Sequence, residues 1–236
     1  MRIVTWNCNG AFRKKFNSIT SLNADILVIQ ECENPELSKD DLYKKWASNY
    51  LWIGDNKNKG LGVFCKPNIK IKKLNWSNTY IDHTVKYFLP CSINEEFTLL
   101  GLWAHHNNSP NFGYIGQFWK YFQINHSNFN NIMIAGDLNS NAIWDQWDRW
   151  WNHTDVINSL SIKGIKSVYH LVKNESQGKE TIPTFYLQRK LEKPYHIDYF
   201  FISDNFQDKL QKFEIKEENE WLEVSDHRPL FMDISI

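Results

Sequence analysis

The chain has 236 residues, enough for one large domain, and a domain of this length buries roughly 70–75% of its unfolded surface. Lys plus Arg number 27 and Asp plus Glu also number 27, so the formal charge of zero argues against a strongly basic nucleic-acid coat or a polybasic membrane anchor. No run approaches the ~20 apolar residues of a membrane span. The N-terminal sequence lacks a signal segment, and the four cysteines form no CxxC pair, so we expect buried free thiols in a soluble cytoplasmic protein.

Apolar runs and helix-spaced segments alternate along the chain without a linker or an internal repeat. In chain order, the pattern predicts a strand over 2–6, a helix over 13–22, a strand over 25–31, a helix over 36–47, strands over 60–65, 86–93 and 97–103, a helix over 112–125, a strand over 131–136, a helix over 142–153, and strands over 181–187, 196–203 and 228–236. This order predicts an α/β fold, a four-layered sandwich of two packed mixed β-sheets flanked by helices, formed by a single domain over 1–236.

Polar side chains recur where the apolar strands begin or end, and strand ends are where rigid scaffolds present side chains to ligands. Any one of them alone is more often a turn or cap residue. The set consists of Asn7 and Asn9 in TWNCNG, Glu31 in IQE, Asp137 and Asn139 in GDLNSN, Asp198 in HIDYFF, and Asp226 and His227 in SDHRPL.

Taken together, the segments TWNCNG, IQE, GDLNSN and SDHRPL, with IDYFFIS in support, resemble the endonuclease/exonuclease/phosphatase superfamily, which has the deoxyribonuclease I-like fold. The resemblance runs from residue 2 to residue 236. It implies a Mg²⁺-dependent phosphodiesterase, with Mn²⁺ as a substitute ion, and favours a nuclease acting on DNA by endonucleolytic or exonucleolytic cleavage. A phosphomonoesterase and a small-molecule or lipid-head-group phosphodiesterase of the same superfamily are the alternatives. A non-catalytic binding module is the second alternative.

The resemblance also implies a metal site built from oxygen ligands. Mg²⁺ prefers one or two carboxylates together with water and phosphate oxygens. Glu31 corresponds to the main metal ligand. Asn7 would add an amide oxygen or orient Glu31, and Asp226 would be a second ligand or support one.

Four further residues take catalytic roles by the same resemblance. Asp137 would act as general base or orient the attacking water. Asn139 would donate a hydrogen bond to the phosphoryl oxygen. His227 would contact the phosphate while Asp198 holds its imidazole, and whether His227 acts as a base or as an electrostatic clamp stays open.

Two positions depart from the superfamily pattern. Asn9 stands where apurinic-site endonucleases carry a carboxylate, which leaves one metal or two as open alternatives. Trp103 stands where members have a phosphate-contacting His or Tyr, and Trp donates one N–H and accepts nothing. In GLWAHHNN, His105 would share the face of Trp103 and supply the missing contact if the strand continued, whereas His106 would point away. The alternative is that both histidines lie in a loop after Trp103.

Two segments carry clues to the substrate. WDQWDRWW places Trp144, Trp147 and Trp151 at helical spacing, which predicts either core packing or a platform for stacking a flat group such as a base. YLQRKLEKPYH carries Arg189 before Asp198 and predicts a basic rim at the substrate cleft or a solvated hairpin loop. A local basic rim on a neutral chain suits a short or single-stranded nucleic acid or a small phosphodiester. We expect a monomer with no membrane partner.

Overall fold

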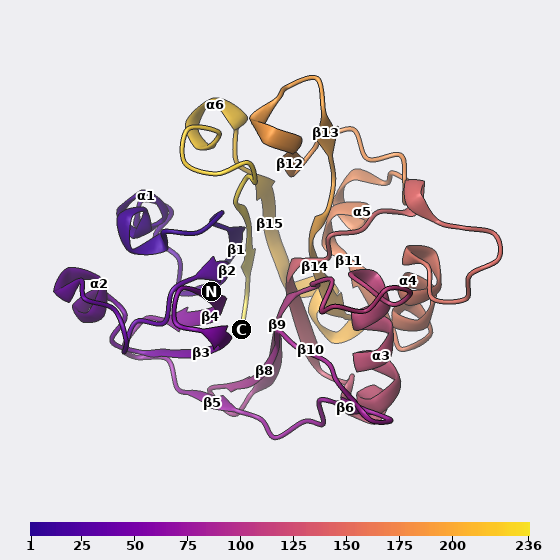
Figure 1. Cartoon of the computed structure of the whole chain (residues 1–236), viewed down its shortest axis with the longest axis horizontal. Helices are drawn as coiled ribbons and strands as arrows, with labels where there is room; N and C mark the ends of the chain where they lie inside the picture. Colours follow the sequence, from indigo (N-terminus) through magenta and orange to yellow (C-terminus); the bar gives the residue numbers. More distant parts are fainter.

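A computed structural model describes residues 1–236 as two six-stranded mixed β-sheets with helices on their outer faces (Figure 1). The first sheet has the spatial order β15 (Leu210–Ile215), β16 (Leu230–Ile234), β1 (Arg2–Asn7), β2 (Ile26–Cys32), β4 (Lys59–Cys65) and β3 (Tyr50–Asn56). The second has the order β11 (Ile165–Ser167), β14 (Asp198–Ser203), β10 (Ile132–Asp137), β9 (Phe97–Trp103), β8 (Phe88–Ile93) and β5 (Ile71–Lys73). The predicted fold class is therefore confirmed.

Six α-helices and two short hairpins complete the chain. The helices are α1 (Phe16–Thr20), α2 (Asp41–Trp46), α3 (Ile115–Asn125), α4 (His153–Ile162), α5 (Val168–Lys173) and α6 (Glu218–Trp221). The hairpins pair β12 (Phe185–Tyr186) with β13 (Pro194–Tyr195), and β6 (Thr79–Tyr80) with β7 (His83–Thr84). None of the helices is both long and apolar enough to cross a membrane. All four cysteines are free thiols, and Cys65 alone among them is only partly buried.

The layers follow from the alternation of side chains along buried strands. In β10, Met133 and Ala135 enter the core between the two sheets, whereas Ile132 and Ile134 pack beneath α3 and α4. On the other side, Val4 and its neighbours on the first sheet pack against α1 and α2. Figure 1 shows α1 and α2 outside one sheet and α3 and α4 outside the other. Burial on both faces explains why these strands are continuous apolar runs.

Strand register brings polar residues to one end of both sheets. β1 runs parallel to β2, with Asn7 opposite Gln30. β10 runs parallel to β9 and antiparallel to β14, so Asp137 lies opposite both Trp103 and Asp198. Because the carboxyl ends of β1, β2 and β10 meet the beginning of β14, residues far apart in sequence converge on this edge.

The predicted helix over 142–153 is wrong. Only Ala142–Trp144 forms a short 3-10 turn, η3, and α4 begins at His153. The helix start is fixed by Asn152, which forms a capping box with Asp155, and by the Asp145 carboxylate, which accepts from the backbone N–H groups of His153 and Thr154. Trp147 and Trp151 therefore lie in an irregular loop despite their helical spacing, because the capping residues start the helix only at His153.

Candidate active site

The Asp137 carboxylate lies at the centre of the converging residues and is completely buried. The Asn7 side chain donates to Asp137 Oδ2 at 2.9 Å, and the Asn139 side chain donates to the same oxygen at 2.9 Å. The Asn139 backbone N–H donates to Oδ1 at 2.7 Å, and its side chain also reaches the Ala104 carbonyl at 3.1 Å. Asn139 adopts a φ of 47°, a left-handed conformation that Asn tolerates, so the turn after β10 folds back onto the carboxylate.

A second buried pair lies beside Asp137. His227 Nδ1 is 2.9 Å from Asp198 Oδ2, and Thr184 donates its hydroxyl to that oxygen at 2.7 Å. The Thr184 oxygen in turn accepts the backbone N–H groups of Ile197 and Asp198, each at 3.0 Å. This network holds the imidazole with Nδ1 toward Asp198 and leaves Nε2 for another partner.

The pKa values of Asp137 and His227 are both raised, but by different causes. Burial, together with the neighbouring Asp198 charge, raises the pKa of Asp137 to about 7. Burial alone would lower the pKa of His227, but the charges of Asp198 and Asp137 outweigh it and raise this pKa to about 9. A buried carboxylate that titrates near neutrality beside a cationic imidazole is an arrangement suited to acid–base chemistry.

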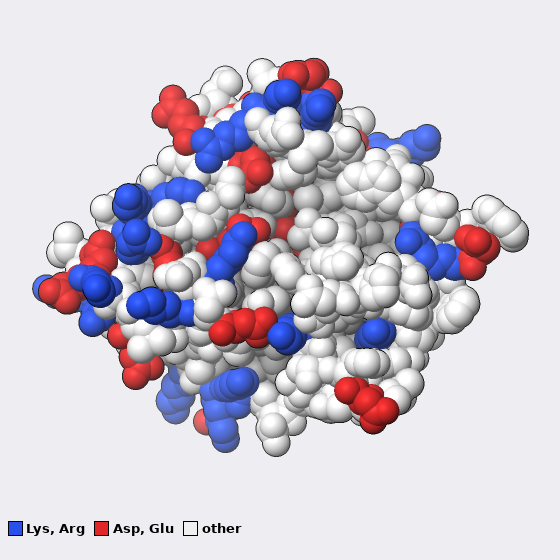
Figure 2. All heavy atoms as spheres, in the orientation of Figure 1, with Lys and Arg blue, Asp and Glu red and all other residues white.

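Glu31 projects toward the same edge from an irregularity in β2. The pairing register of β2 with β4 shifts between Gln30 and Cys32, and Glu31 has a φ of 64°, so a β-bulge aims this side chain out of the ladder. Its Oε1 lies 3.4 Å from the Asn7 side-chain nitrogen, and its Oε2 lies 2.7 Å from Lys59 Nζ. Figure 2 shows acidic side chains inside a hollow near the centre of this face.

The carboxylate oxygens of Glu31 and Asp137 suit Mg²⁺, because this hard cation prefers oxygen ligands. Asn7 donates its side-chain N–H toward both carboxylates and accepts the Asn9 backbone N–H on its oxygen, so in this arrangement it orients them. A second set with ligand atoms within 4.8 Å of one another consists of Asp137, Asp198 and His227. The imidazole of this second set is already held by Asp198, so the first set fits Mg²⁺ better.

Three other predicted site residues lie at the margin. Asn9 is exposed, has a φ of 52°, and donates its backbone N–H to the Asn7 side chain at 3.0 Å. Asp226 is partly buried beside His227, and its carboxylate forms no hydrogen bond within the protein. Arg189 is exposed in the β12–β13 connection and donates to the Glu223 carbonyl at 3.1 Å, so it contacts none of the central carboxylates.

The two adjacent histidines both follow the end of β9 at Trp103, so they are loop residues. The ring centroid of His105 lies 4.9 Å from that of buried Trp103 and 5.3 Å from that of Tyr87. Burial, together with the charge of Lys59, lowers the pKa of His105. His106 is exposed and lies against Tyr114 and along a cavity that Asn139 also lines. Each histidine therefore borders the site from a different direction.

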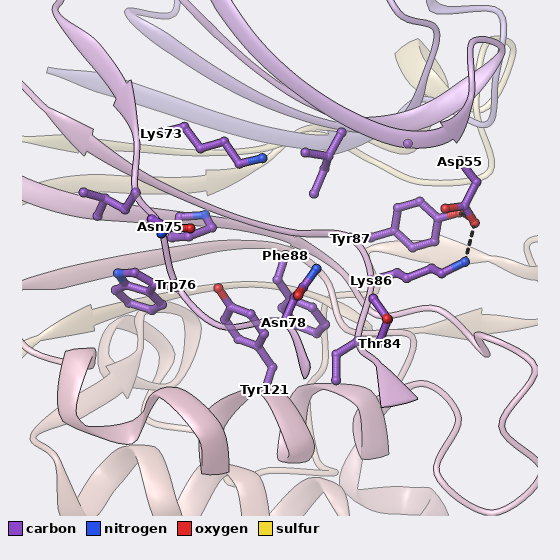
Figure 3. A pocket seen from close by; sticks show the side chains of 15 residues that line it. Asp55, Lys73, Asn75, Trp76, Asn78, Thr84, Lys86, Tyr87, Phe88 and Tyr121 are labelled. Atoms are coloured by element: carbon purple, nitrogen blue, oxygen red, sulfur yellow. Dashed lines mark hydrogen bonds and ion pairs between the residues drawn. The ribbon is translucent and has the colours of Figure 1, made fainter. Parts of the chain in front are cut away.

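A separate pocket of about 330 Å³ lies between β3, β8 and α3 (Figure 3). Trp76 and Tyr121 line its interior, and an ion pair between Lys86 and Asp55, at 2.9 Å, lies at one end. None of the predicted site residues lines it. It adjoins the site through Tyr87, whose ring contacts Trp103 and His105.

A comparison of the sequence with models of known protein families covers all of these site residues, from Asn7 at the end of β1 to His227. The family model described as the endonuclease/exonuclease/phosphatase family matches residues 4–227. The chain belongs to this family. The comparison with curated proteins finds no match.

Several solved structures share this fold. The 3′ phosphatase NExo from Neisseria, bound to a product DNA hairpin, is 16% identical with a TM-score of 0.68, and the match covers 100% of both chains. The AP endonuclease from Leishmania major is 11% identical with a TM-score of 0.70, covering 100% of this chain and 87% of that one. The human Nocturnin catalytic domain is 15% identical with a TM-score of 0.67, covering 100% and 94%.

Sequence reasoning missed Lys59 and Thr184. Lys59 is part of the run NKNKG, and its pairing with Glu31 depends on the β3–β4 turn, which lies beside the end of β2 only after folding. Thr184 precedes β12, and its position one residue before an aromatic pair gives no hint of a bond to Asp198.

Proposed function

We propose that this member of the endonuclease/exonuclease/phosphatase family is a Mg²⁺-dependent phosphodiesterase that cleaves nucleic acid, with DNA as the favoured substrate. One observation carries the proposal: a buried carboxylate, Asp137, receives hydrogen bonds from Asn7 and Asn139 beside the Asp198–His227 pair. Hydrolysis of a phosphodiester needs a base, a hydrogen-bond donor and a cation at one place. In this cluster Asp137 would be the base, Asn139 the donor and protonated His227 the cation.

The metal would be held by Glu31, with Asn7 adding an amide oxygen or orienting Glu31 and with Asp226 as a further ligand or support, and Mn²⁺ would substitute for Mg²⁺. When bound, the ion would neutralise phosphate charge and lower the pKa of a coordinated water. Lys59 already neutralises one oxygen of Glu31 at 2.7 Å, so it would give way to the cation or share this carboxylate with it.

The protein's own groups would supply the rest of the chemistry. Asp137, with a pKa of about 7, would accept a proton from the attacking water or orient it. The Asn139 side chain would then donate to a phosphoryl oxygen the N–H that it directs at the Ala104 carbonyl in this structure. His227 would place its Nε2–H on the phosphate as a cation, because Asp198 holds Nδ1.

The outer residues would bind substrate rather than react. Asn9 and Arg189 lie on exposed loops around the site and would contact the phosphate backbone. Buried Trp103 would form the pocket wall, with His105 packed on it. We expect the enzyme to act as a monomer in the cytoplasm, and sedimentation or gel filtration would test its oligomeric state.

A phosphomonoesterase is the second candidate, because one structure with this fold is described as a 3′ phosphatase bound to a product DNA hairpin. No observation favours the lipid-head-group phosphodiesterase. A binding module without catalysis would leave the buried Asp137 and Asp198 charges without a chemical role.

A substrate panel tests the proposal. Purified protein with Mg²⁺ or Mn²⁺ is incubated with plasmid, single-stranded DNA, abasic duplex, RNA and phosphomonoesters. We expect cleavage of at least one nucleic acid, abolished by chelation and by Asp137→Asn. Turnover of phosphomonoesters alone would favour the second candidate, and no turnover on any substrate would refute both.

A further inference from the structure

A cavity of about 400 Å³ opens directly beside Asn139 and is walled by aromatic and basic side chains. Because the Asn139 side chain also hydrogen-bonds Asp137, the cavity and the catalytic carboxylate share one residue. A single planar group with its attached sugar fits a cavity of this size. Its other main lining residues are His106, Tyr114, Trp144, Arg149 and Trp151.

The aromatic walls of this cavity are held in place before any ligand arrives. Trp151 lies 4.6 Å from Phe112 and packs on α3 at Gly116, where a Cβ would come within 3.1 Å of the indole. The ring centroid of Trp144 lies 5.2 Å from that of Tyr195, and 41% of the Trp144 surface is exposed. Trp144 is therefore a fixed ring with free surface, which lowers the entropic cost of stacking a ligand on it.

Arg149 adds a positioned cation at the same cavity. Its Nε donates to Asn152 at 2.8 Å, its Nη2 donates to the Trp144 carbonyl at 2.9 Å, and the guanidinium lies 4.4 Å above the Trp151 ring. Its Nη1 makes no hydrogen bond within the protein. Arginine in such a setting offers its remaining N–H groups to a phosphate.

We propose that this cavity binds an unpaired nucleobase, stacked on Trp144, from the nucleotide adjoining the phosphate at Asp137, with Arg149 on a neighbouring phosphate. This inference rests on the proposed function. A base within a duplex is stacked on both faces and paired along its edge, so only an unpaired or flipped base can enter a cavity that holds one ring. The substrate class that follows is single-stranded nucleic acid or an unpaired end.

The surroundings of the cavity favour a neutral ring over a highly charged group. Its aromatic lining carries one fixed cation, Arg149, and no carboxylate. In Figure 2, most of the surface over the α3 and α4 side is uncharged, whereas charged side chains are mixed on the α1 and α2 side. A nucleotide presents this combination, with a flat neutral base and one phosphate.

Calorimetric binding of deoxyadenosine 5′-monophosphate and of 2-deoxyribose 5-phosphate, in Mg²⁺, separates the base from the phosphate. We expect the nucleotide to bind wild-type protein about tenfold or more tightly, as base–aromatic stacking predicts. Trp144→Ala should remove most of this difference, and Trp144→Phe should retain part of it. Trp147→Ala is the matched control, because Trp147 lies on the same loop with 97% of its surface exposed and does not line the cavity.

Equal affinity of the two ligands for wild-type protein would overturn the proposal. An equal loss of nucleotide affinity in Trp144→Ala and Trp147→Ala, with both variants shown to be folded by thermal melting, would also overturn it. Cleavage of single-stranded DNA by wild-type protein is measured in parallel. If DNA is cleaved but the two ligands bind equally, the cavity assignment fails and the proposed function stands. If the nucleotide is preferred but no phosphoester is hydrolysed, the cavity assignment stands and the proposed function fails.

Discussion

Replacing Asp198 by Asn removes the charge that keeps His227 protonated. The pKa of His227 is raised from its ordinary 6.5 to about 9, and a 2.5-unit rise corresponds to about 3 kcal/mol in favour of the cation. Without Asp198, burial acts against the cation, and we expect this pKa to fall to 6.5 or below. At pH 8 the imidazole would then change from about 90% to about 3% protonated, so a cationic clamp would lose roughly thirtyfold in rate.

Two measurements check this prediction. A pH titration of the His227 ring by nuclear magnetic resonance, in metal-free protein with chelator, should show the midpoint move from about 9 to 6.5 or lower. Hydrolysis of single-stranded DNA in Mg²⁺ at pH 8 should fall about thirtyfold or more. Thr184→Ser is the matched control, because it keeps the hydroxyl that donates to Asp198. An unchanged midpoint in Asp198→Asn, or a rate that rises as the neutral imidazole accumulates, would refute the cationic role.

Three other changes test the site and its scaffold. Lys59→Ala should tighten Mg²⁺ binding about two- to fivefold by calorimetry, because an exposed ion pair with Glu31 contributes at most about 1 kcal/mol; weaker binding would contradict competition. The pKa of Asp137 is raised to about 7 from 3.8, so the urea stability of the metal-free wild-type protein should fall relative to that of Asp137→Asn as pH rises from about 4 to about 7; a difference between the two proteins that does not change with pH would count against the assignment. Gly136→Ala should lower the free energy of unfolding by about 2–4 kcal/mol, and with it the melting temperature, because at a φ of 150° an added Cβ would lie 1.9 Å from the Leu102 carbonyl oxygen. An unaltered melting temperature would show that β10 shifts to accommodate the methyl group.

Much of the layered fold could be predicted because strand periodicity and burial are local properties. The runs at 25–31 and 131–136 lie within one residue of β2 and β10, since strands buried on both faces must be continuously apolar. The edge strand β15 was missed, because Lys and Glu on an exposed edge make LQKFEI look like a solvated segment. The helix predicted over 142–153 failed for the opposite reason: its tryptophans have helical spacing, but Asn152 starts the helix later.

The sequence by itself determined the family, through the motifs around Asn7, Glu31, Asp137 and His227, and the layered fold, through its apolar pattern. Only the tertiary structure decided which side chains touch. Lys59 meets Glu31 because the β3–β4 turn lies beside the bulge in β2, and His105 and His106 contact different neighbours because β9 ends before them. Such contacts depend on sheet register and loop path, which are set by long-range packing that no local stretch of sequence encodes.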